Sequence, residues 1–137
     1  MLTHMNSRLA ILTMFWLLGA VTLFHLCIVL KIIPYEITWG GRLKNDTEMY
    51  VFESVSILIN LFLCFILCIK GNYLTEIIPV KIVNSLLWAF LFLFSINTLG
   101  NLFAETFLEK SLSLLTLIFT YLIWIILRGS KKKHNIT

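Results

Sequence analysis

Four long apolar segments, separated by short polar ones, constrain this 137-residue chain more than any other feature of its sequence. A helix rises about 1.5 Å per residue, so about 20 apolar residues suffice to cross about 30 Å of hydrocarbon. Hydrophobic residues make up 59% of the chain and charged residues only 13%, against roughly 25% charged in soluble domains. This composition indicates an integral membrane protein. It excludes a disordered chain, a disulfide-stapled secreted miniprotein and a nucleic-acid-binding domain. The apolar segments cover about residues 9–33, 50–69, 82–103 and 111–127.

Each apolar segment is predicted to be a helix, because unpaired backbone polar groups are costly in lipid and the alternation of a membrane strand is missing. We therefore expect an all-α fold, an integral membrane four-helix bundle that forms a single membrane domain over residues 1–137. The fourth segment is the shortest, so we expect it to stand nearly upright or to thin the bilayer locally. A loop at 34–49 and a basic tail at 128–137 flank the predicted spans.

Lysine and arginine are distributed unevenly between the two sides that four spans define. The side with the termini holds seven of them: Arg8, Lys70, Lys81, Arg128, Lys131, Lys132 and Lys133. The other side holds four: Lys31, Arg42, Lys44 and Lys110. The positive-inside rule then predicts that the N- and C-termini are both cytoplasmic. The first segment is longer than the apolar part of a signal peptide, about 7–15 residues, so we interpret it as a retained helix.

The first loop has the composition of a segment that lies along the membrane surface. Asn45, followed three residues later by Glu48, predicts a variant capping box that opens the second helix. Gly40 and Gly41 allow a tight reversal of the chain. Aromatic side chains that suit the headgroup layer complete the loop: Tyr35, Trp39 and Tyr50.

Polar residues inside the apolar segments recur at helical spacing, which places them on single helix faces. Glu53 is followed by Ser56, Asn60 and Cys64 at steps of three or four. In the third segment the same spacing joins three further residues: Asn97, Asn101 and Glu105. We expect both faces to point into the bundle rather than at lipid. With the predicted topology, these residues and His25 gather toward the outer side of the membrane.

Ionisable residues within membrane spans are costly, so they indicate a functional site by default. The predicted catalytic candidates are Glu53, Glu105 and His25. The predicted ligand-binding residues are Glu36, Trp39, Arg42, Glu53, Asn60, Asn97 and Asn101. A structural alternative stays open, in which the asparagines form interhelical hydrogen bonds. In the same alternative, Glu53 pairs with Arg42 or with an amide of the first loop and only holds that loop in place.

No cofactor and no metal site is predicted. Metal binding needs three or four converging ligands, and no nucleotide-binding, zinc-binding or redox-cysteine spacing occurs. Three cysteines lie inside the spans and are interpreted as small buried hydrophobic residues: Cys27, Cys64 and Cys68. The lysine run from 131 to 133 is interpreted as an anchor on anionic lipid, and no nucleic acid partner is expected.

Several short patterns resemble those of uncharacterised small bacterial four-span integral membrane proteins. They are the run from Trp39 to Leu43, the run from Glu48 to Glu53, the pattern Asn97-Thr98-x-Gly100-Asn101, and Ala104-Glu105. The resemblance covers most of the chain and implies a multi-pass protein of a bacterial inner membrane, with no implied activity. In span count and size the chain is also similar to small four-span lipid-binding or isomerase-like families, such as the EXPERA domain and the DoxX-like proteins. Their motifs do not match residue by residue.

Three functions follow as hypotheses. The favoured one is not enzymatic: the protein binds a lipid or small amphipathic molecule in an outer-side polar pocket, or serves as an accessory subunit of a membrane complex. The second is an intramembrane enzyme, an isomerase or a lipid-modifying activity that uses a buried glutamate. The third is an oligomeric channel or small transporter. The expected partners are membrane lipid and either a second copy of the chain or another membrane protein.

Overall fold

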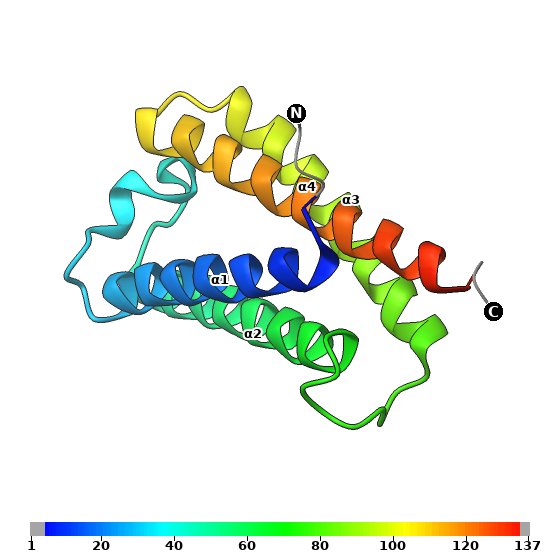
Figure 1. Ribbon diagram of the computed structural model, residues 1–137. Helices are drawn as coiled ribbons and strands as arrows, with labels where there is room; N and C mark the ends of the chain where they lie inside the picture. The colour runs from blue at the N-terminus through cyan, green and yellow to red at the C-terminus, as the bar shows by residue number, and fades with distance from the viewer. Residues whose placement is uncertain (1–4, 135–137) are drawn as a thin grey trace.

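The computed structural model describes residues 5–134, with their side chains as far as residue 129. The elements in chain order are α1 (Ser7–Val29), η1 (Tyr35–Ile37), η2 (Trp39–Gly41), α2 (Asp46–Lys70), α3 (Val80–Leu102) and α4 (Phe107–His134), where η marks a 3-10 helix. Figure 1 shows their arrangement. In the described chain, all four α-helices are long and apolar enough to cross a membrane. The predicted all-helical fold with four apolar spans is confirmed, and it is compatible with a multi-pass membrane protein.

Two helix boundaries, the end of α1 and the start of α2, differ from the predicted boundaries. Local hydrogen bonds set both of them. α1 ends at Val29, before the predicted boundary, because Lys31 adopts a positive φ of 58° and Ile32 donates back to the Cys27 carbonyl at 2.9 Å. α2 begins at Asp46, because the Asn45 side chain caps it and accepts from the Glu48 N–H at 2.8 Å. The connecting loop therefore covers residues 30–45.

The fourth helix corrects the expectation of a short, upright span. Its apolar part runs over Phe107–Gly129 and has 23 residues, the same length as the candidate spans of α1 and α3. The helix starts early because Thr106 caps it, with its hydroxyl accepting from the Glu109 N–H at 3.2 Å. α4 also continues through the predicted tail to His134. The side chains of the lysine run at 131–133 lie outside the described part of the chain.

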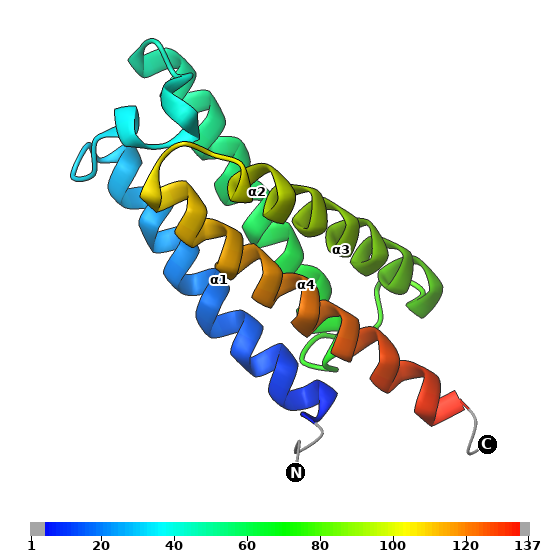
Figure 2. The same cartoon turned by 90° about the horizontal axis from the view of Figure 1, so that it is seen from above.

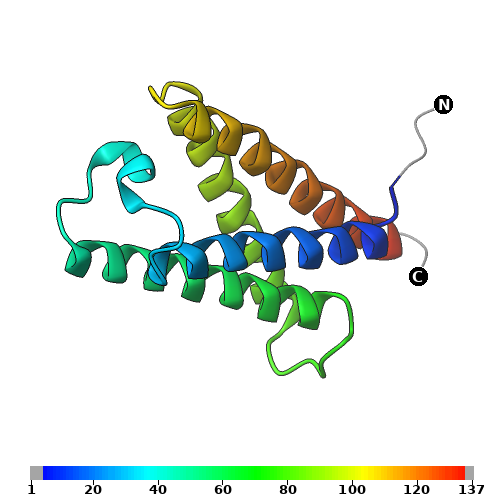
Figure 3. The same cartoon turned by 90° about the vertical axis from the view of Figure 1, so that its left-hand side faces the viewer.

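The helices form two antiparallel pairs that diverge toward one end. α3 and α4 share the most extensive interface, α1 packs against both α2 and α4, and the contact between α2 and α3 is smaller. Figure 2 shows that α1 starts and α4 finishes at the same end, which we call the terminal end. Figure 3 shows the pairs close together there and farther apart at the opposite end, where the loop of residues 30–45 folds against them. We call this opposite end the loop end.

Buried residues are distributed unequally along the bundle. The main hydrophobic core fills the terminal half, and α2 contributes Leu63, Ile66, Leu67 and Ile69 to it. A smaller cluster at the loop end contains Ile28, Leu43 and Met49. The buried polar residues of the described chain belong to neither cluster: Thr38, Glu53, Asn60, Glu109 and Ser113. Along α2, Glu53 and Asn60 lie between Met49 of the smaller cluster and Leu63 of the main core.

The outer surface of the helices is strongly apolar. Large hydrophobic side chains are exposed on every helix, for example Trp16, Leu58, Phe92 and Leu114. Water-soluble monomers rarely expose continuous apolar surface on this scale. This surface suits contact with lipid chains.

Candidate functional site

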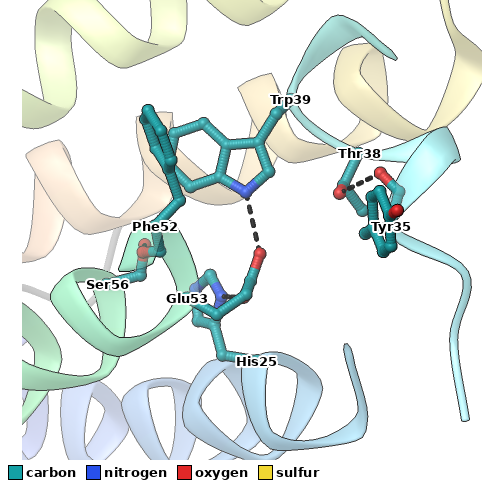
Figure 4. A network of polar contacts seen from close by, with 7 residues as sticks. All are labelled: His25, Tyr35, Thr38, Trp39, Phe52, Glu53 and Ser56. Carbon is teal, nitrogen blue, oxygen red and sulfur yellow. Dashed lines mark hydrogen bonds and ion pairs between the residues drawn. The ribbon is translucent and has the colours of Figure 1, made fainter. Parts of the chain in front are cut away.

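Glu53 is the most deeply buried ionisable side chain of the described residues, with 0% of its surface exposed. Its Oε2 lies 2.5 Å from Nδ1 of His25 on α1, and its Oε1 accepts a hydrogen bond of 2.8 Å from the Trp39 indole N–H. Figure 4 shows the three side chains converging from α1, α2 and η2. We call His25, Trp39 and Glu53 the Glu53 cluster. This contact uses Nδ1 of the imidazole and leaves its other nitrogen, Nε2, outside the pair.

The path of the loop backbone brings Trp39 to the Glu53 carboxylate. Trp39, Gly40 and Gly41 have successive positive φ angles of 54°, 65° and 67°. A left-handed conformation costs a residue with a side chain about 1 kcal/mol, so the structure around Trp39 must compensate for it. The indole does so through its bond to Glu53 and through edge-on packing on Phe52, with ring centroids 5.1 Å apart.

Both oxygens of the Glu53 carboxylate take part in hydrogen bonds, but only one of the two ring nitrogens of His25 does. Burying a carboxylate is costly unless it is paired and hydrogen-bonded, and here both conditions are met. The His25 side chain is 16% exposed, and among the described residues nothing hydrogen-bonds to its Nε2. The bond at Nδ1 fixes the orientation of the ring, so Nε2 is available to a molecule that reaches it.

The spacing prediction for α2 is confirmed in its burial pattern. Glu53 and Asn60 are both buried, and Ser56 between them is half-buried. The Ser56 hydroxyl donates back to the Phe52 carbonyl at 2.9 Å. The Asn60 side chain is 6% exposed, and its Nδ2 has no hydrogen-bond partner within the described chain.

The predicted polar face of α3 does not join the Glu53 cluster. Asn97 is exposed and Asn101 is half-buried, so the expectation that this face points into the bundle is wrong for Asn97. Glu105 is exposed in the turn between α3 and α4. The helix pairs diverge toward the loop end, so this part of α3 lacks the cover that a parallel-sided bundle would provide. α3 instead buries an apolar stripe: Val83, Leu87, Phe90 and Phe94.

The remaining predicted residues of the loop are not part of the cluster. Arg42 and Glu36 are both exposed. One structural alternative was a pairing of Glu53 with Arg42. In the structure the loop residue that contacts Glu53 is Trp39, through its indole N–H.

Glu109 is a buried carboxylate that the sequence analysis did not select. It is 8% exposed, and its Oε2 accepts from the Thr106 hydroxyl at 2.7 Å. Its Oε1 lies 3.3 Å from the position that a Cβ would take at Gly40, so the loop touches the start of α4 here. Thr106 followed three residues later by Glu109 is a capping-box pattern, and this signal could have located the start of α4 but not its contact with the loop.

Two other predicted features can be placed. Within residues 5–129, no group of three His, Cys, Asp or Glu side chains is arranged to hold a metal ion. The three cysteines are free and half-buried.

At the loop end Lys31 donates to Asp46, and this contact raises the pKa of Lys31 and links the end of α1 to the start of α2.

No family model, curated protein or solved structure matches this chain. The candidate site consists of the Glu53 cluster with the free Nε2 of His25 and, two turns farther along α2, the buried amide of Asn60.

Proposed function

We propose that this protein binds a lipid or another small amphipathic molecule at its loop end, with the Glu53 cluster as the polar part of the site. One observation carries the proposal: a fully buried carboxylate holds the His25 imidazole 2.5 Å away within helices apolar enough to span a membrane. Such residues are costly in a membrane segment and are retained mainly where they have a function.

The imidazole of His25 suits a polar headgroup in either protonation state. When neutral with its proton on Nδ1, it offers Nε2 as an acceptor to a hydroxyl or amine. When protonated, it donates from Nε2 to a phosphate or carboxylate, and the Glu53 carboxylate stabilises its charge. Arg42 is exposed in the same loop as Trp39 and offers a further cationic group, which favours an anionic headgroup. By the positive-inside rule, the loop end faces the outer side of the membrane.

The test is native mass spectrometry of the protein extracted gently from its own membrane, comparing the wild type with His25→Phe and Glu53→Gln. The wild type should retain a defined lipid, and each variant should lose most of it. Glu76→Gln removes an exposed carboxylate from the connection between α2 and α3 and serves as the matched control. Equal lipid retention by the folded wild type and both cluster variants would overturn the proposal. A stable complex with another membrane protein and no lipid would instead favour an accessory subunit.

A second candidate function is an intramembrane isomerase, favoured by the pairing of His25 with Glu53. A carboxylate that orients an imidazole through Nδ1 leaves Nε2 as a general base. Nε2 would take a proton from one atom of the substrate and return it to another, so the reaction needs no further reactant. Incubation with native lipid extract in heavy water tests this. An isomerase of this kind incorporates deuterium into one lipid class, and His25→Phe abolishes the incorporation.

A further inference from the structure

The geometry points to Asn60 as a second, deeper contact for the same ligand, one that binds a hydrogen-bond acceptor such as the ester carbonyl of an acylated lipid. This inference rests on the proposed function and specifies the chemistry of its ligand. It adds a polar contact below the headgroup and therefore separates acylated lipids from amphiphiles that carry only alkyl chains.

Asn60 carries a buried amide nitrogen, Nδ2, that lacks a hydrogen-bond partner among the described residues. The Asn60 side chain is 6% exposed. Buried donors in native proteins are nearly always hydrogen-bonded, and the cost of leaving one unpaired rises in an apolar surrounding. Other polar side chains in the helices meet this need internally. Thr98, for example, donates to the Thr116 hydroxyl at 2.9 Å and contacts the Phe94 carbonyl.

Asn60 lies deeper along α2 than Glu53, as seen from the loop end. The two residues lie on the same face of α2, two helical turns apart, which corresponds to about 10 Å along the helix axis. Asn60 lies on the side of Glu53 that leads toward the main core, and the next buried residue of α2 in that direction is Leu63. Asn60 is therefore the last buried polar residue of α2 before its apolar core residues begin.

The order of the Glu53 cluster and Asn60 along α2 corresponds to the order of polar groups in an acylated lipid. Nε2 of His25 is suited to the headgroup, and a primary amide N–H donates to a carbonyl oxygen. In an acylated lipid a polar headgroup is followed by ester carbonyls and then by alkyl chains. The order along α2 is the same: an ionisable cluster, a single amide donor and an apolar core.

The experiment compares two probes that differ only at the carbonyl groups. Delipidated wild-type protein is titrated with diacyl phosphatidylglycerol and with the dialkyl ether lipid of the same headgroup and chain length. Native mass spectrometry or tryptophan fluorescence gives the two dissociation constants. We expect the ester lipid to bind about tenfold more tightly, the difference that one good hydrogen bond makes. Asn60→Leu should bind both lipids with the weaker affinity.

The outcomes separate this inference from the proposed function. If the wild type binds both lipids equally and His25→Phe weakens both, the headgroup site stands and the role of Asn60 is overturned. If Asn60→Leu keeps the preference for the ester, a different residue provides the donor and the inference also fails. If neither lipid binds the wild type above the background of empty micelles, the inference fails, and the proposed function is decided by whether the natively extracted protein retains a lipid. The comparison of lipids on the wild type decides the question even where Asn60→Leu does not fold.

Discussion

Glu53 of α2 and His25 of α1 lie 28 positions apart in the sequence, yet Oε2 of one is 2.5 Å from Nδ1 of the other. Trp39 occupies the second oxygen of the same carboxylate at 2.8 Å. One buried side chain therefore joins two helices and the loop that connects them. Because the pair is sealed from one side by the loop, a change in any of the three residues should affect both loop docking and ligand binding.

Glu53→Leu is expected to destabilise the protein by about 2–4 kcal/mol, because it removes the partner of both the largely buried His25 imidazole and the partly exposed Trp39 indole N–H. Glu53→Gln should cost less, since its amide oxygen still accepts from Trp39. Thermal unfolding in detergent measures both effects. Glu76→Leu is the control for loss of an exposed carboxylate and should change the melting temperature little. An unchanged melting temperature in Glu53→Leu contradicts the contact.

Trp39→Phe is expected to loosen the loop without unfolding the helices, because phenylalanine keeps the packing on Phe52 and loses the N–H bond to Glu53. The loss should amount to about 1 kcal/mol. Hydrogen exchange of the amides in residues 34–45 should become faster, and exchange in the main core should not. Trp16→Phe is the matched control, because Trp16 is 83% exposed on α1. Equal protection of the loop in the Trp39 and Trp16 variants would rule out the indole bond as its anchor.

Gly40→Ala and Gly100→Ala are expected to change stability in opposite directions. Gly40 has a φ of 65°, and a Cβ there would lie 3.3 Å from Oε1 of Glu109, so alanine should cost about 1–2 kcal/mol. Gly100 is helical, and a Cβ there meets nothing within 4 Å, so alanine should stabilise by about 0.5–1 kcal/mol. Thermal unfolding of the two variants beside the wild type measures the difference. The same sign for both would show that the loop does not dock on α4 in this way.

Asn60→Leu is expected to stabilise the delipidated protein by about 1 kcal/mol, because it replaces an unpaired buried amide with an apolar side chain. With bound lipid the order should reverse, since the wild type gains a hydrogen bond that the variant lacks. Unfolding with and without added diacyl lipid measures both states. Asn97→Leu changes the same residue type at an exposed position and should show no reversal. A variant that is less stable in both states would indicate an internal partner for the amide.

The four apolar helices could be predicted from the amino-acid sequence, because length and hydropathy are local properties and lipid permits few other backbone structures. The cap of α2 could be predicted as well, since Asn45 and Glu48 need only a short segment of chain to meet. The placement of Glu53 and Asn60 on one face of α2 follows from helical spacing. In each case the residues concerned are within a few turns of one another.

Which polar side chains contact one another could not be predicted from the sequence, because these contacts depend on the packing of distant segments. The contact of Trp39 with Glu53 depends on three successive positive φ angles in the loop, and the burial of Glu109 depends on where that loop reaches α4. The exposure of Asn97 depends on the divergence of the two helix pairs, which spacing along one helix does not contain. Helical periodicity assigns a residue to a face, but the packing of distant segments determines whether that face is covered and which side chain lies opposite.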